Sequence, residues 1–215
     1  MSAIIGIAPA PRHIMDLSNY VVVDVETTGL AYKQGTRCDD VIEVGALKVN
    51  NGQVVGEFQR LVRWWVCPAV PEMITSLTGI TSDMLVQSGH RPEEVMREFL
   101  QFVGDLPLVA HNAAFDRGFL YSTIERCQSR CESKNLPPLP ELKNDFFDTM
   151  AMARKLYSGS HSLGNLAQAL NIRVEVAHRA LADCYTAHYL LQIMMRDCNW
   201  DKWWANRVGW KLYEK

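Results

Sequence analysis

Apolar residues recur along the chain with two periods, and these periods predict strands first and alternating strands and helices afterwards. The β-branched run YVVVDV at 20–25 indicates a buried strand. Two further strand-like runs, 41–49 and 53–65, are separated by Asn50-Asn51-Gly52, and Asn-Gly between such runs is typical of a hairpin. The first part of the chain is therefore expected to form an antiparallel three-stranded meander.

Helical spacing dominates the later part of the chain. Residues 71–103 repeat with a helical period, and Pro92 is a typical first residue of a helix. Short apolar strands are expected at 106–110 and within 141–149. Further helices are predicted at 113–131, 149–157, 162–170 and 180–196. This order predicts an α/β fold with a five-stranded mixed sheet and helices on both faces.

Composition narrows the class of protein. The chain has 215 residues, 48% hydrophobic and 21% charged, as expected for one globular domain. A formal net charge of −2 argues against a protein that coats nucleic acid, so any nucleic-acid contact is expected to be local. No apolar run is long enough to span a membrane, and no membrane partner is expected.

The ends of the chain differ in composition from its middle. We expect a leader at 1–18, a domain at 19–197, and a tryptophan-rich tail at 198–215 that packs on the domain or on a partner. The first residues lack the basic start of a secretory signal, and the six cysteines lack zinc-site spacing. A reducing, cytoplasmic location with free thiols is expected.

Acidic residues at three places are candidates for chemistry. Asp24 and Glu26 alternate along the first strand, so both point to one face, where a divalent cation would offset their repulsion. A solvated strand end is the alternative. Asp116 lies early in a helix, where the macrodipole alone would explain an acid. His178 precedes Asp183 by five residues and has the pKa range of a general base. Either residue alone is more often structural.

Together these segments resemble the three motifs of the DnaQ-like 3′→5′ exonuclease family. VDVETTGL, AHNAAFDRGFL and HRALADC stand in the family's order, with IEVGALKV after the first. Arg179 occupies the position where one branch has tyrosine, so the chain resembles the DEDDh branch. The resemblance implies a ribonuclease H-like fold, covering about residues 19–195.

The resemblance also implies an activity and a set of roles. It implies metal-dependent hydrolysis of the 3′-terminal phosphodiester, releasing nucleoside 5′-monophosphates. Asp24, Glu26, Asp116 and Asp183 would hold two Mg²⁺ or Mn²⁺ ions, and His178 would be the general base. The expected substrates are single-stranded or frayed 3′ ends, with DNA favoured over RNA. A partner-dependent proofreading or scaffold subunit is the alternative, and a homodimer and a polymerase-type partner both stay open.

Contacts to the terminal nucleotide are implied at two segments. The substrate-binding candidates are Thr27, Leu30, Leu77, Thr78, Ile80 and Asn112. For Ile80 core packing is the alternative, and for Asn112 we favour a helix cap over a substrate contact. Asp148 is also expected to cap a helix. Arg126, Arg130 and Lys134 form one helical stripe, either a solvated face or a track for a nucleic-acid backbone.

Overall fold

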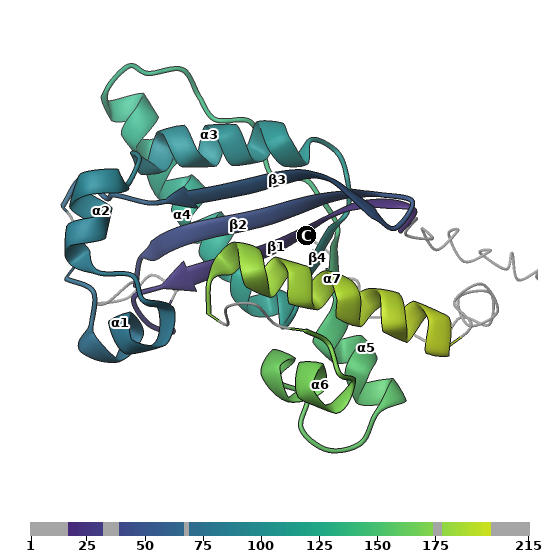
Figure 1. Ribbon diagram of the computed structural model, residues 1–215. Coiled ribbons are helices and arrows are strands. Elements are labelled where there is room, and N and C mark those ends of the chain that lie inside the picture. Colours follow the sequence, from purple (N-terminus) through teal and green to yellow (C-terminus); the bar gives the residue numbers. More distant parts are fainter. Residues whose placement is uncertain (1–16, 32–38, 67–68, 174–177, 199–215) are drawn as a thin grey trace, which may run out of the picture.

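The computed structural model describes residues 17–31, 39–66, 69–173 and 178–198 (Figure 1). Its strands are β1 (Asn19–Thr27), β2 (Val41–Asn50), β3 (Gln53–Leu61), β4 (Leu108–Ala110) and β5 (Phe146–Asp148). Its helices are α1 (Glu72–Thr78), α2 (Ser82–Ser88), α3 (Pro92–Val103), α4 (Ala113–Ser133), α5 (Thr149–Leu156), α6 (Leu163–Ala169) and α7 (Ala180–Asp197).

The five strands form one mixed sheet in the order β3-β2-β1-β4-β5. The first three strands pair antiparallel, whereas β4 and β5 run parallel to β1. The β2–β3 hairpin turns at Asn51 and Gly52, which both have positive φ, of 47° and 77°. The predicted meander and the mixed sheet are confirmed.

Helices cover both faces of the sheet, as predicted (Figure 1). Alternate residues of β1 enter two separate cores: Val21 and Val23 lie in one, and Tyr20 and Val22 in the other. Helices α3 and α4 pack over the first face, and α7, backed by α5 and α6, over the second. By the same alternation, Asp24 and Glu26 continue the row of Tyr20 and Val22 toward α7.

Several predicted boundaries change. The third strand ends at Leu61 rather than Trp65, and Val62 forms only an isolated bridge with His90. The helical stretch 71–103 divides into three helices, because Gly79 ends α1 in a left-handed conformation, Thr81 caps α2, and Gly89 ends α2 before Pro92 starts α3. Each break has a local sequence cause, a glycine or a capping threonine.

Parts of the expected leader and tail lie outside the described residues. At the first described position, Leu17 is buried in the core beneath α7. Residues 1–16 and 199–215 are not described, so the tail with its four tryptophans stays a prediction. The four cysteines in the described ranges are free thiols. Among the described helices, none is both long and apolar enough to cross a membrane.

Candidate active site

Three carboxylates meet where β1 passes beneath the first turns of α7. One oxygen each of Asp24, Glu26 and Asp183 lies within 4.8 Å of the others, and all three side chains are half-buried. Hard oxygen donors at this spacing suit Mg²⁺ or Mn²⁺. The structure brings Asp183, from a helix distant in the sequence, to the two acids of β1, and metal binding by the three stays a prediction.

Asp116 joins this group from the other side of β1. It lies in the first turn of α4, is only 2% exposed, and its Oδ1 accepts a hydrogen bond of 3.2 Å from the backbone N–H of Val25. That N–H lies between Asp24 and Glu26 in the sequence. The bond therefore ties α4 to β1 at the position of the two acids, which a favourable macrodipole alone would not require.

Burial and mutual repulsion raise the pKa of each acid in this group. The pKa of Asp24 lies well above its ordinary value, first because of burial and then because of the charges of Asp116, Asp183 and Glu26. Burial likewise raises the pKa of Asp116. A bound cation would reverse this by stabilising the ionised carboxylates.

Burial and nearby charged side chains also shift the pKa values of Glu26 and Asp183. Burial, with the charges of Asp183 and Glu43, raises the pKa of Glu26 to about 7 against the opposing effect of Arg179. The pKa of Asp183 is raised by burial and held back by His178. The site therefore holds more negative charge than its own protein cations offset.

His178 stands beside Asp183 at the entrance to α7. Its backbone N–H donates to the Asp183 carboxylate, and its side chain is exposed. His178 also has a φ of 58°, a conformation that is uncommon for a non-glycine residue and often marks a functional site. The structure therefore places His178 in hydrogen-bond contact with Asp183, and its role as general base stays a prediction.

A buried glutamate of β2 anchors the start of α7. Glu43 is fully buried and accepts hydrogen bonds from Arg179 Nε and Nη2 at 3.1 and 2.6 Å. It also accepts from the backbone N–H of Ala180 at 3.0 Å and from Gln59 Nε2 at 2.9 Å. Gly45, two residues along, lies so close to α7 that a Cβ there would meet the Ala180 carbonyl carbon at 2.4 Å.

The sequence analysis assigned no role to Glu43, Gly45 or Arg179 in building the site. The signal that was available is the position of Glu43 and Gly45 in an otherwise apolar strand, VIEVGALKV. A charge in such a strand requires a buried partner, and a glycine there often marks the close approach of another backbone.

The residues predicted to hold the terminal nucleotide divide into exposed and internal ones. Leu30 is 82% exposed and Leu77 is 49% exposed, so both have apolar surface available to a ligand. Thr27 is buried and donates its hydroxyl proton to the Gly29 carbonyl at 2.6 Å. Substrate contact by Thr27, Leu30 and Leu77 stays a prediction.

Two of these candidates are core residues instead. Ile80 is fully buried in a cluster with Ile42 and Leu85, so core packing, the alternative kept open for it, is what the structure shows. The Thr78 hydroxyl donates to the Ile74 carbonyl and accepts from the Ile80 N–H. Direct contact of Thr78 or Ile80 with a base does not fit this burial.

The two predicted helix caps have different outcomes. Asp148 caps α5 as predicted, because its Oδ1 accepts from the N–H groups of Met150 and Ala151 at 2.9 and 3.3 Å. Asn112 occupies the N-cap position of α4, but its side chain makes no capping bond, so that prediction is wrong. Its backbone is left-handed, and its N–H donates to the same Asp148 Oδ1 at 3.1 Å.

Sequence comparison places the chain among exonucleases. The exonuclease family profile matches residues 21–191. The PolC-type DNA polymerase III of Halalkalibacterium halodurans is 38% identical over 184 residues, which are 84% of this chain and 12% of that protein. The corresponding polymerase of Bacillus subtilis is 36% identical over 87% of this chain and 12% of its own length. The chain thus spans about an eighth of these relatives.

Structural comparison agrees with this placement. Exonuclease X, solved in complex with 5′ overhanging duplex DNA, aligns with a TM-score of 0.60 and 26% identity over 90% of this chain and 95% of its own. The nuclease domain of 3′hExo, a DEDDh family member bound to rAMP, aligns with a TM-score of 0.65 and 18% identity, over 84% of this chain and 92% of its own. The DnaQ-like resemblance is confirmed, and the chain belongs to the exonuclease family.

Proposed function

We propose that this chain removes nucleotides one at a time from the 3′ end of a DNA strand, using two divalent metal ions held by Asp24, Glu26, Asp116 and Asp183. The observation that carries the proposal is the meeting of Asp24, Glu26 and Asp183 oxygens within 4.8 Å. Asp116 adds a buried carboxylate through its bond to Val25. Like charges at this density need cations, and the exonuclease family supplies the chemistry that uses them.

The donor set fits Mg²⁺ or Mn²⁺. All four protein ligands are carboxylates, the hard oxygen donors that these ions prefer over zinc-type nitrogen and sulfur ligands. Metal ions bound there would supply Lewis-acid activation of water and of the scissile phosphate. We assign one ion to Asp24, Glu26 and Asp183, because these acids share a single cluster, and the second to Asp24 and Asp116.

His178 is the proposed general base. Its exposed side chain is free to meet a water molecule approaching the substrate, and its contact with Asp183 keeps it beside the acidic cluster. An unprotonated imidazole nitrogen can accept the proton that this water loses when it attacks phosphorus. The neighbouring carboxylate then stabilises the imidazolium that results.

DNA is the proposed substrate because of the relatives. The PolC-type proteins are DNA polymerases, and Exonuclease X was solved with DNA. Exposed Leu30 and Leu77 offer apolar contact to a terminal base without reading its sequence. An unpaired or frayed 3′ end suits such a site better than a base-paired one, since the terminal base must leave its stack.

A proofreading subunit is the second candidate, favoured by the identity with PolC-type polymerases, of which this chain spans about an eighth. It predicts a stable complex with a polymerase that persists in Asp24→Asn. A stand-alone enzyme predicts no such complex and full activity of the purified chain.

The test compares cleavage of a DNA strand with cleavage of an RNA strand. DNA and RNA of identical sequence, labelled at the 5′ end, are incubated with wild type, with Mg²⁺ or EDTA, beside His178→Ala. A ladder shortening from the 3′ end, on DNA before RNA, and absent with EDTA or in the variant, is the expected result. Intact strands with every metal, although the protein is folded, would contradict the proposal.

A further inference from the structure

A pocket separate from the carboxylate cluster lies on the opposite face of the sheet. It has a volume of about 370 Å³ and lies where the segment after β3 meets the start of α3 and the second half of α4. The residues around it are Arg63, Trp64, Trp65, Arg91, Glu93 and Arg130. Arg130 belongs to the helical stripe for which a nucleic-acid backbone track was one of the two predicted roles, and none of the six residues has a role in the proposed cleavage step.

The pocket is positively charged. Three guanidinium groups face it, and within the described ranges none of Arg63, Arg91 and Arg130 forms an ion pair with a carboxylate. Glu93 is its one acid, and Glu93 Oε2 accepts the indole N–H of Trp65 at 2.9 Å. Arg63 Nη1 donates to the Val86 carbonyl at 3.0 Å, and its remaining guanidinium donors are available for an anion together with those of Arg91 and Arg130.

The aromatic part of the pocket is held in place. Trp64 is buried and donates its indole N–H to the Val41 carbonyl at 2.8 Å, and Arg126 stacks on its ring at 3.7 Å. Trp65 meets Trp64 edge to face at 5.4 Å and stays 37% exposed. Arg130 lies over the Trp65 ring, 4.9 Å from its centroid. An exposed ring fixed from behind is a suitable stacking platform.

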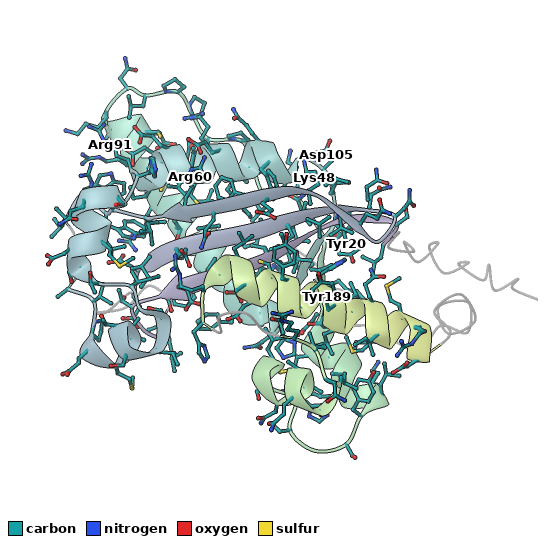
Figure 2. All side chains as sticks on the ribbon, viewed as in Figure 1. Tyr20, Lys48, Arg60, Arg91, Asp105 and Tyr189 are labelled. Atoms are coloured by element: carbon teal, nitrogen blue, oxygen red, sulfur yellow. The ribbon has the colours of Figure 1, made fainter. Side chains whose placement is uncertain are left out.

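The pocket and the carboxylate cluster belong to the same end of the sheet. The Val41 carbonyl that binds Trp64 belongs to the residue paired with Thr27, directly after Glu26. The backbone N–H of Val62 donates to the Ile42 carbonyl of β2 at 2.9 Å, so the segment entering the pocket runs two strand spacings, about 10 Å, from β1. Figure 2 shows Arg91 at the end of the sheet toward which β1 runs.

We propose that this pocket binds the phosphodiester backbone of the substrate strand several nucleotides to the 5′ side of the nucleotide in the active site, an inference that rests on the proposed function. Arg63, Arg91 and Arg130 bind phosphate oxygens, and Trp65 stacks on a base. Phosphate contacts of this kind hold the strand without reading its sequence. The arrangement gives a chain of net charge −2 the local positive site that a polyanion needs.

The test is a binding measurement on Asp24→Asn, in which the strand is not consumed. Fluorescence anisotropy would follow single-stranded DNA of 2 and 16 nucleotides over a series of salt concentrations. Each of R63Q, R91Q and R130Q is expected to weaken binding of the 16-mer by about fivefold, the upper range for a partly exposed charge pair. The triple variant should lower the salt slope by about 2, at about 0.7 for each lost phosphate contact.

The controls separate the pocket from the active site and from the fold. The dinucleotide has one phosphodiester, which the active site itself would hold, so its affinity should change less than that of the 16-mer. R154Q, an equal change of charge on α5 of the other face, should leave the 16-mer affinity unchanged. Thermal unfolding of each variant establishes that the fold is intact.

Three results would overturn the proposal. One is an unchanged salt slope in the folded triple variant. Another is an equal loss of affinity on both lengths, which would place these arginines at the 3′ terminus. The third is tighter binding of a polyglutamate peptide than of DNA by the same arginines, which would indicate an acidic protein partner. Wild-type cleavage of the dinucleotide tests the proposed function separately, because its single phosphodiester is the one that would be cleaved.

Discussion

The guanidinium group of Arg179 holds the fully buried carboxylate of Glu43 through two hydrogen bonds, of 3.1 and 2.6 Å. The same carboxylate accepts the backbone N–H of Ala180, so one side chain of β2 fixes the entrance of α7. Asp183 lies one turn further along this helix, and its N–H donates to the Arg179 carbonyl at 2.9 Å. Glu43 is therefore a positioning residue for Asp183.

Replacing Glu43 with glutamine should weaken both the fold and the site. Glu43→Gln removes the charge that Arg179 and Ala180 share, and we expect a loss of about 2 kcal/mol of unfolding free energy, the usual range for bonds to a charged group. A small shift of α7 should lower kcat roughly 10- to 100-fold, because misplacement of catalytic groups has effects of this size. Urea unfolding and steady-state kinetics measure the two effects.

A purely structural role for Glu43 would leave the metal response unchanged. The positioning role predicts that Glu43→Gln needs a higher Mg²⁺ concentration for half-maximal activity, since Asp183 moves with α7. Arg60→Gln is the matched control, because its ion pair with Glu98 at 3.1 Å is well exposed. Equal Mg²⁺ responses in Glu43→Gln and wild type would count against the positioning role.

Gly45→Ala should disturb α7 from the same strand. The added Cβ would lie 2.4 Å from the Ala180 carbonyl carbon and 2.5 Å from the Leu181 nitrogen, both backbone atoms that cannot rotate away. We expect a loss of about 1–3 kcal/mol, the usual cost of overpacking, together with a fall in kcat. Gly164→Ala, where a Cβ meets nothing within 4 Å, is the control. Normal activity in Gly45→Ala would show that α7 can shift without harm.

Asp148→Ala should destabilise the junction between β5, α5 and α4. The Asp148 Oδ1 accepts the N–H groups of Met150, Ala151 and Asn112, and the substitution leaves all three without this acceptor. Loss of an N-cap costs about 1 kcal/mol, and the additional Asn112 bond brings the expected loss to about 2 kcal/mol. Chemical denaturation measures this loss of unfolding free energy. A loss no larger than that of an ordinary surface substitution would contradict the capping role of Asp148.

Stability should fall in mild acid because of His188. Gln192 donates to the Tyr20 hydroxyl at 2.9 Å, which leaves the Tyr20 proton for His188 Nδ1 at 3.0 Å, so the ring is held neutral. Burial lowers the pKa of His188 below its ordinary value of 6.5. The unfolded chain therefore binds the proton more tightly, and stability that is complete above pH 6.5 is lost as the pH falls toward the lowered pKa.

His188→Asn isolates this effect, because its amide oxygen can accept the Tyr20 proton without titrating. The unfolding midpoint should fall more steeply from pH 7 to pH 5 in wild type than in the variant. The pKa of His111 is also lowered by burial, but His111 is present in both proteins and cancels in the comparison. Parallel pH profiles would show that His188 does not carry the acid sensitivity.

The fold was largely predictable from local patterns. The β-branched run of β1, the Asn51-Gly52 turn and the proline that starts α3 each act within a few residues, and each prediction is confirmed. Failures arose where the outcome depends on distant neighbours. The sequence pattern predicts a strand through Trp64 and Trp65. In the structure, the Trp64 indole donates to the Val41 carbonyl and the Trp65 indole donates to Glu93.

The site shows the same division. The two-residue period of a strand places Asp24 and Glu26 on one face. The resemblance to the exonuclease family indicated the roles of Asp116, Asp183 and His178. Contacts across the chain were beyond a single sequence: the Glu43–Arg179 pair joins residues 136 positions apart, and no local period connects them. The burial of Ile80 is equally non-local, because it depends on Ile42 and Leu85.

The central claim is that water attacks the terminal phosphorus at the cluster of Asp24, Glu26, Asp116 and Asp183. Digestion of a DNA strand in ¹⁸O-labelled water with Mg²⁺, followed by mass spectrometry, tests it most directly. We predict nucleoside 5′-monophosphates carrying one ¹⁸O and a shortened strand with a 3′-hydroxyl, with the rate at least about 10²-fold lower in Asp24→Asn. Nucleoside 3′-phosphates, unlabelled products, or an unchanged rate in Asp24→Asn would contradict the account.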